Sequence, residues 1–291
     1  IRMQVLENEV LKVAISANGA ELQSIYHKTV QLEYLWQGDP VVWPRKAPVL
    51  FPIVGKVKNN EYTVTDKKYS LTQHGFARDR MFDCIHFTNT SCTYRLSHSE
   101  ASLLVFPFEF ELDVIYTIEG ESLTVSYRVF NPSTSKELYF SIGAHPGFNC
   151  PLVEGETFED YYLEFEKSEK LSRVLLEGGL RSDASEEVLL TNKKLPLSAD
   201  LFTVKDAIVV SGLYSECISL KSKKSSHGLH FNYKNYPWFG IWSKPGPFIC
   251  LEPWMGVADD IHSDGNFIKK EGIQSLKPNT ENLFSYSISL F

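Results

Sequence analysis

The stretch LLVFPFEFELDVIYTIEG at 103–120, followed by ESLTVSYRVFNPS at 121–133, decides the fold. Apolar and polar residues alternate through both segments, and Glu119, Gly120 and Glu121 separate them. Alternation with a period of two is typical of a strand with one buried face, and a short turn containing Gly indicates a hairpin. We therefore predict two antiparallel strands here, with SCTYRLSHS at 91–99 as the strand before them.

The same pattern extends in both directions along the chain. MQVLENEVLKVAI at 3–15 and ISANGAELQSIYH at 15–27 predict an opening β-meander, and FSYSISLF at 284–291 predicts a final strand. Further strands are predicted within 62–71, 81–87, 160–167, 173–179, 206–213, 217–233 and 237–254, whereas the polar segment 182–200 is expected to hold only a short helical piece. So many strands in one sheet would curl or split, so we predict one all-β domain over 1–291, a large antiparallel β-sandwich.

Composition narrows the classes of partner. The net charge of −7 argues against nucleic acid or an anionic membrane surface, because both require a basic footprint. No apolar run reaches the roughly 20 residues that span a bilayer, and residues 1–20 lack the apolar core of a signal peptide. The five cysteines are scattered without a CxxC pair. We expect a cytoplasmic protein without cofactor or metal; the oligomeric state stays open.

A histidine at a strand end is the first candidate site residue. In YFSIGAHPGFNCP at 139–151 a β-run stops at His145, and Gly143, Pro146 and Gly147 fix the turn around it. Reactive side chains are often held at such turns. The alternative is a buried structural histidine bonded to a backbone carbonyl.

Four further residues are candidates, each with a plain alternative. Glu252 follows the apolar run FICL and precedes Pro253, so it is either a surface carboxylate at a strand end or a carboxylate in a desolvated pocket. His74 in QHGF is either a ligand contact or a solvated loop residue, and the same alternative holds for Arg45 in WPRKAP and for Asp206 before AIVVSG.

Other chemistries have weaker support. The pair His227 and His230 has no third ligand at metal spacing. Asp259 and Asp260 could pair with Glu252 as in a glycosidase, which needs two carboxylates across the scissile bond.

Four ordered motifs resemble one family. RKAPVLFPIVG at 45–55, QHGFARD at 73–79, GAHPGF at 143–148 and LEPWMG at 251–256 resemble the aldose 1-epimerase (galactose mutarotase) family, in its LacX-like branch. The resemblance implies a sugar substrate, with Glu252 as general base, His145 as general acid and His74 as a second imidazole near the ring. It also implies that Arg45 and Asp206 bind sugar hydroxyls.

The chemistry of anomer exchange fits these residue types. One base takes the proton of the C1 hydroxyl and one acid protonates the ring oxygen, and we expect the two groups on opposite sides of the hemiacetal. Trp43, Phe148, Trp242 and Trp254 could stack on the sugar or belong to the core.

Two alternative functions stay open. The segment GKVKNN at 55–60 departs from the arginine-rich run of the galactose-specific branch, and Arg45 with Arg78 also resembles the hexose-6-phosphate epimerases. The second alternative is a carbohydrate-binding or sensor protein without turnover.

Overall fold

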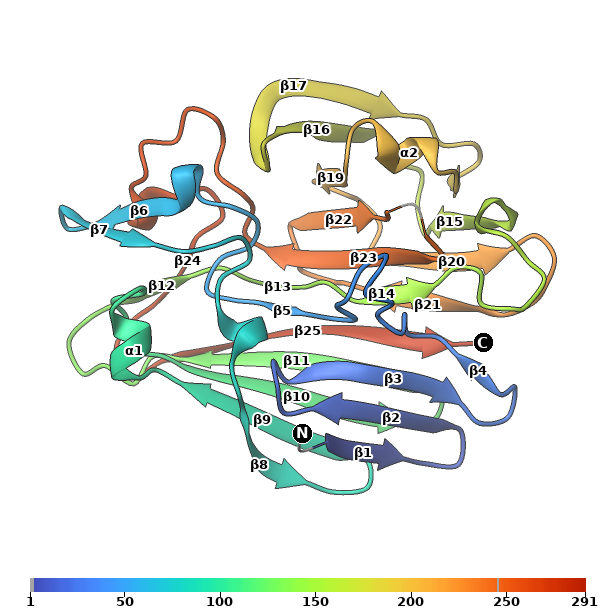
Figure 1. Cartoon of the computed structure of the whole chain (residues 1–291), viewed down its shortest axis with the longest axis horizontal. Coiled ribbons are helices and arrows are strands. Elements are labelled where there is room, and N and C mark those ends of the chain that lie inside the picture. The colour runs from blue at the N-terminus through green and yellow to red at the C-terminus, as the bar shows by residue number, and fades with distance from the viewer. Residues whose placement is uncertain (1–2, 245) are drawn as a thin grey trace.

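A computed structural model describes residues 3–244 and 246–291, so Ile1, Arg2 and Pro245 of the expected domain lie outside it. It consists mainly of antiparallel strands in two large sheets and one smaller sheet (Figure 1), which confirms the all-β prediction. In spatial order, the nine-stranded sheet contains β18 (Lys194–Pro196), β15 (Tyr161–Phe165), β20 (Cys217–Ser222), β21 (Gly228–Asn232), β25 (Glu281–Leu290), β11 (Ser122–Phe130), β10 (Glu111–Glu119), β9 (Ser91–Ser97) and β8 (Asp83–Phe87).

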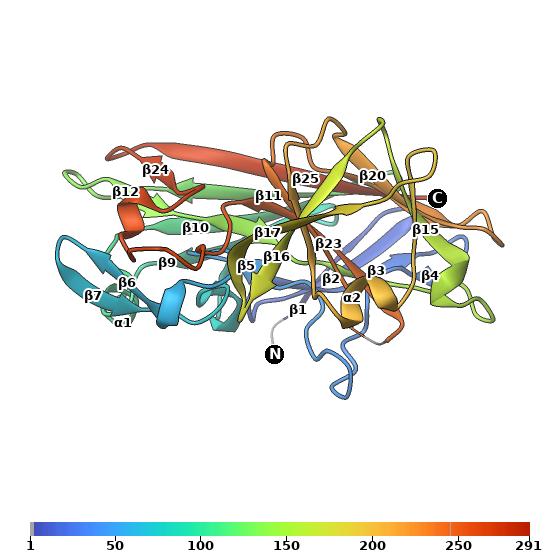
Figure 2. The ribbon, with the colours of Figure 1, turned by 90° about the horizontal axis from the view of Figure 1, so that it is seen from above.

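The second large sheet has eight strands and extends across the upper half of Figure 1. Its order is β17 (Leu180–Val188), β16 (Leu171–Glu177), β19 (Ile208–Ser211), β22 (Trp238–Trp242), β23 (Phe248–Met255), β13 (Ile142–Ala144) and β5 (Val49–Leu50), with β14 (Gly147–Asn149) also paired to β23. The view from above in Figure 2 places the β16–β17 hairpin over the middle of the molecule.

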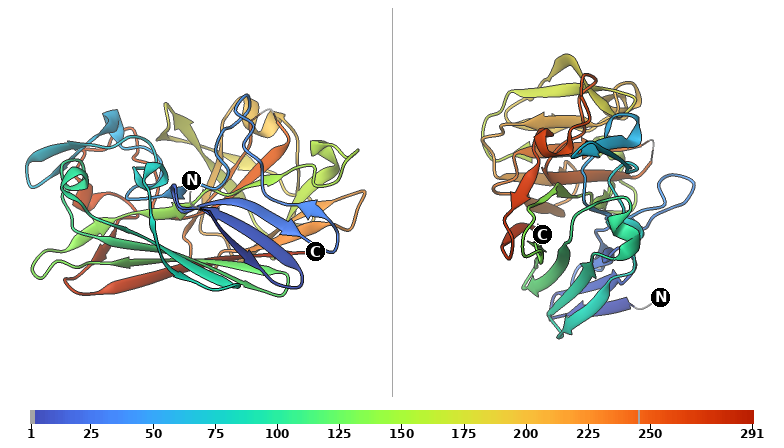
Figure 3. Two further views of the ribbon diagram at one scale, coloured as in Figure 1. Left: turned by 60° about the horizontal axis from the view of Figure 1, so that its bottom comes forward. Right: turned by 90° about the vertical axis from the view of Figure 1, so that its left-hand side faces the viewer.

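A four-stranded sheet packs against the nine-stranded sheet (Figure 3). The hydroxyls of Tyr94 and Tyr116 donate across this contact to the carbonyls of Ile15 and Ala20, at 3.2 and 2.6 Å. The strands of the four-stranded sheet are β1 (Met3–Glu7), β2 (Leu11–Ser16), β3 (Glu21–His27) and β4 (Leu32–Glu33). Antiparallel pairing of β1 with β2 and of β2 with β3 confirms the expected β-meander.

Short elements complete the chain. Two small two-stranded sheets pair β6 (Glu61–Val64) with β7 (Lys67–Ser70) as a hairpin, and β12 (Leu138–Phe140) with the distant β24 (Gln274–Leu276). The helical pieces are η1 (Lys58–Asn60), η2 (Ala77–Asp79), α1 (Glu100–Leu103), η3 (Phe158–Asp160), α2 (Asp200–Thr203) and η4 (Phe267–Lys269). Within the described residues, no helix has the length and apolarity that crossing a membrane requires.

The central hairpin forms as predicted, but it starts later than the sequence pattern indicates. Glu119 pairs with Ser122 across the tight turn that joins β10 to β11. The segment 103–110 is not strand, because Ser99 caps α1 and Pro107 interrupts the run that follows. The strand therefore begins at Glu111.

The expectation for 182–200 is wrong. Most of this segment belongs to β17 and β18, and α2 begins only at Asp200. β17 is polar because it is the edge strand of the eight-stranded sheet, where β16 is its one neighbouring strand among the described residues. An exposed edge strand does not need the apolar alternation that marks a half-buried one.

Alternation along β23 separates two environments. Ile249 and Leu251 join the main core between the sheets, which also contains Val125 and Tyr127 of β11. Residues of the opposite face join two small separate clusters, one with Cys250 and one with Trp254. The outer face of the eight-stranded sheet is therefore apolar at both ends of β23, with Glu252 between them.

Candidate active site

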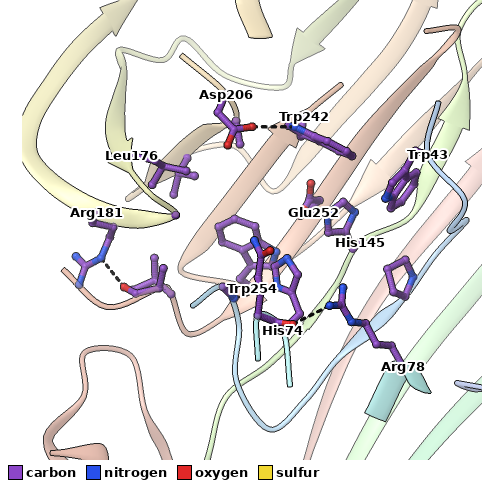
Figure 4. Close-up of a pocket in the computed structure, with 18 of the residues that line it drawn as sticks. Trp43, His74, Arg78, His145, Leu176, Arg181, Asp206, Trp242, Glu252 and Trp254 are labelled. Carbon is purple, nitrogen blue, oxygen red and sulfur yellow. Dashed lines mark hydrogen bonds and ion pairs between the residues drawn. The ribbon is translucent and has the colours of Figure 1, made fainter. Parts of the chain in front are cut away.

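A cavity of about 380 Å³ lies on this outer face (Figure 4). Its floor comes from β19, β22 and β23, and its walls come from the loop after β4, the turn before η2 and the β16–β17 hairpin. The segment between β4 and η1 contributes Trp43, Pro48 and Gly55. Of the six site residues selected from sequence, His74, Arg78, His145, Asp206 and Glu252 line this cavity.

Glu252 lies buried in the middle of β23, so of its two alternatives the surface carboxylate at a strand end is wrong and the desolvated pocket is confirmed. On one side Gly240 of β22 pairs with Glu252 and Phe239 pairs with Pro253. On the other side β13 pairs only as far as Trp254, and β14 starts its pairing at Cys250. This break tolerates a proline in a central strand, because no ladder hydrogen bond is required there.

His145 occupies that break. It directly follows β13, so its imidazole is delivered to the same point of β23 as the Glu252 carboxyl. His145 Nε2 lies 3.3 Å from Glu252 Oε2, and the two side chains are 11% and 2% exposed. The ring packs against Trp43 and Trp242, with centroids 5.0 and 5.6 Å away. The two groups therefore lie side by side, without room for a sugar ring between them.

Burial controls the protonation of this pair. It raises the pKa of Glu252 well above its usual value, and the nearby charge of Asp206 acts in the same direction. It lowers the pKa of His145 to about 3, and the positive charges of Arg78 and Arg45 add to this effect. Both effects disfavour the charged form of each group, so near neutral pH the pair holds one proton in total.

His74 is held as a hydrogen-bond donor toward the cavity. Its Nδ1 accepts the Gly55 N–H at 3.0 Å, and its ring meets His145 edge to face with centroids 5.6 Å apart. Burial, followed by the neighbouring His145, lowers the pKa of His74 well below its usual value. A neutral imidazole that accepts at Nδ1 carries its proton at Nε2.

The two arginines near the site are placed differently. Arg78 lines the cavity, and its Nη2 donates to the Gln73 carbonyl at 2.8 Å. Arg45 does not line the cavity, since its Nη2 binds Asp79 Oδ1 at 2.9 Å. A contact between Arg45 and a sugar therefore stays a prediction, and it would require this ion pair to open.

Asp206 reaches the cavity from the loop before β19. Its Oδ1 accepts the Trp242 indole N–H at 3.0 Å, and its carbonyl accepts a bond from Arg173 at 2.7 Å. The φ angles of Asp206 and His74 are +59° and +65°. Left-handed backbone outside glycine is uncommon and often occurs at functional sites.

The structure also shows which aromatic candidates line the cavity, and it adds residues to the cavity lining. Trp43, Trp242 and Trp254 line the cavity, whereas Phe148 is fully buried in the main core. Arg181, Lys244 and Gln73 also line it and were not selected from sequence, because nothing in their local pattern distinguishes them from surface residues.

One group of metal-ligand type occurs in the part of the chain that the structure describes. His145, Cys250 and Glu252 have ligand atoms within 4.8 Å of one another. Two of these residues form the pair described above, and burial raises the pKa of the Cys250 thiol well above its usual value. A neutral thiol is a poor ligand, so the donor set favours proton transfer over metal binding.

A family model described as aldose 1-epimerase matches residues 2–278. The chain belongs to the aldose 1-epimerase family. Within this family it is similar to the chromosomal protein LacX of Lactococcus lactis subsp. lactis, with 37% identity over 98% of each chain. The predicted family resemblance, including its branch, is confirmed.

Solved structures of similar proteins agree with this family assignment. A galactose mutarotase related enzyme from Lactobacillus acidophilus superposes with a TM-score of 0.94 at 36% identity, covering 100% of this chain and 97% of the other. A galactose mutarotase-like protein from Lactobacillus casei ATCC 334 gives 0.93 at 32% identity, with both chains fully covered. These matches support an isomerase of the mutarotase type.

Proposed function

We propose that this protein interconverts the α and β anomers of a free aldohexose, with Glu252 and His145 as its acid/base pair. The supporting observation is the 3.3 Å contact between His145 Nε2 and Glu252 Oε2 at the floor of a cavity of about 380 Å³. Membership of the aldose 1-epimerase family supports the reaction class.

The contact suits a reaction at one carbon. The C1 hydroxyl oxygen and the ring oxygen O5 are both bonded to C1, so a base and an acid that serve them must be neighbours. Glu252 takes the hydroxyl proton, the C1–O5 bond breaks as the C1 carbonyl forms, and His145 protonates O5. Rotation about C1–C2 then presents the other carbonyl face, and the same two groups reverse both transfers.

One proton is sufficient for the whole cycle. Ring opening converts a Glu252 carboxylate and a His145 imidazolium into a carboxylic acid and a neutral imidazole, and ring closure restores the first state. The pair is neutral as a whole in both states, so a desolvated site tolerates each of them. The 3.3 Å contact also lets the resting pair exchange its proton directly.

The other cavity residues supply binding. His74 Nε2–H is a donor for a sugar oxygen, and the outer oxygen of Asp206 is an acceptor for a hydroxyl. The indole faces of Trp43 and Trp242 offer apolar surface to the C–H groups of the ring.

A hexose 6-phosphate is our second candidate substrate, and a carbohydrate-binding protein without turnover is our third candidate. We rank the free sugar first because two nearby guanidinium groups already have carboxylate partners. Arg45 binds Asp79 at 2.9 Å, and Arg181 binds Glu271 at 2.6 Å. A phosphate that bound either of these two arginines would have to displace its carboxylate.

NMR exchange between anomers tests the proposal with glucose, galactose and glucose 6-phosphate, each with and without the protein. We expect faster exchange for a free sugar, and a rate that falls to background in Glu252→Gln. Acceleration of the phosphate alone would promote the second candidate, and saturable binding without exchange would support the third.

A further inference from the structure

We infer that Trp254 is a positioning residue for Glu252, whose indole N–H donates to the carboxylate when that group is ionised. This inference rests on the proposed function, since it assigns a partner to the proposed base. Trp254 and Glu252 are two residues apart on β23, so their side chains leave the same face of the strand. Both line the cavity (Figure 4).

Two glycines fix the plane of the indole. A Cβ added at Gly143 of β13 would lie 2.8 Å from Trp254 Cδ1, and one added at Gly240 of β22 would lie 2.7 Å from Cζ2. The five-membered ring therefore lies over one neighbouring strand and the six-membered ring over the other. Any side chain at either position would displace the ring, so both strands accommodate this one orientation.

The indole N–H is available for a bond. Trp254 is 7% exposed, and its Nε1 is a buried donor without a partner among the described residues. Such donors are unfavourable, so an acceptor is expected at some stage of the reaction cycle. Glu252 Oε2 faces His145, and ionisation makes both carboxyl oxygens charged and therefore stronger acceptors.

The proposed bond has a specific effect on the pair. It stabilises the ionised carboxyl more than the neutral acid and therefore lowers the pKa of Glu252, against the larger raising effects of burial and Asp206. The state with a carboxylate and an imidazolium, which starts ring opening, becomes more populated. Trp254 thus favours transfer of the proton from Glu252 to His145.

Trp254→Phe tests this directly, because it keeps a ring over the two glycines and removes the donor. We expect kcat to fall by about ten- to a hundredfold, the range for a hydrogen bond to a charged group. The alkaline limb of the pH profile of kcat/KM should move up by about one pH unit, since the last proton of the pair is then lost at higher pH.

Trp238→Phe is the matched control. Trp238 packs on the same apolar cluster as Trp254 but does not line the cavity. Its substitution should leave both limbs of the profile in place. A Trp254→Phe enzyme with unchanged limbs and a raised KM would overturn the inference and make the N–H a sugar contact.

A second measurement needs neither turnover nor a stable Trp254 variant. In protein labelled with ¹⁵N in its five indoles, the Trp254 signal should titrate with pH, and the titration should vanish in Glu252→Gln while the other four signals report an intact fold. A Trp254 signal that ignores pH, or that titrates equally in Glu252→Gln, would refute the bond. Absence of anomer exchange with any aldose would instead refute the proposed function and leave this titration intact.

Discussion

Glu252→Gln should remove most of the anomer exchange without unfolding the protein. Gln has nearly the same shape but cannot accept the hydroxyl proton, and a general base contributes about 10² to 10⁴ in rate. His145→Asn should cost a similar factor. Because the two groups share one proton, the double variant should be no slower than the slower single variant, whereas independent groups would multiply their losses.

The same substitution has a defined effect on stability. The pKa of Glu252 is raised by burial from an unfolded value near 4.5, so above pH 4.5 the folded state retains a proton that the unfolded carboxyl releases. This lowers the free energy of unfolding by about 1.4 kcal/mol per pH unit until the folded group also ionises. Gln does not ionise, so the variant does not lose this free energy of unfolding as the pH rises. Its stability relative to the wild type should therefore rise from pH 5 to pH 7.

Thermal unfolding and anomer exchange on the same samples check both parts. We expect an exchange rate reduced at least a hundredfold and a Tm at pH 7 equal to or above that of the wild type. A Tm lowered by several degrees would mean that Glu252 is a structural residue. An exchange rate within a few-fold of the wild type would mean that another group is the base.

Three further measurements test His145, His74 and the buried pair of Lys270 and Asp259 separately. The pH profile of kcat/KM should be flat from about pH 5 to pH 7, because the pKa of His145 is about 3, and a midpoint near 6.5 would contradict that assignment. His74→Asn, which tolerates the left-handed backbone, should lower kcat/KM about tenfold with little change in Tm; an unchanged kcat/KM would exclude His74 from sugar binding. Lys270→Met should cost about 3–5 kcal/mol in urea unfolding, because it leaves Asp259 buried without its partner at 2.6 Å; a cost below about 1 kcal/mol, or no recovery in the Asp259→Asn double variant, would show that the pair contributes little.

Much of the fold could be predicted because alternation reports which face of a strand is buried. The β10–β11 hairpin and the opening meander follow directly from that pattern. The polar strand β17 could not be predicted, because an edge strand gains its structure from pairing rather than from an apolar face.

The arrangement of the site was harder to predict than the identity of its residues. The motifs selected His145 and Glu252, but their adjacency depends on the break between β13 and β14, which no local pattern indicates. Pro253 suggested a strand end, whereas the break lets β23 continue through it. The left-handed backbone of His74 and Asp206 was likewise not predicted from the sequence.

A crystal structure of Glu252→Gln with a bound aldose would test the central claim most directly. The account predicts that the C1 hydroxyl lies within hydrogen-bond distance of the carboxamide at position 252, and that the ring oxygen lies within the same distance of His145 Nε2. A sugar bound with C1 directed away from this pair, or bound outside the cavity, would contradict it.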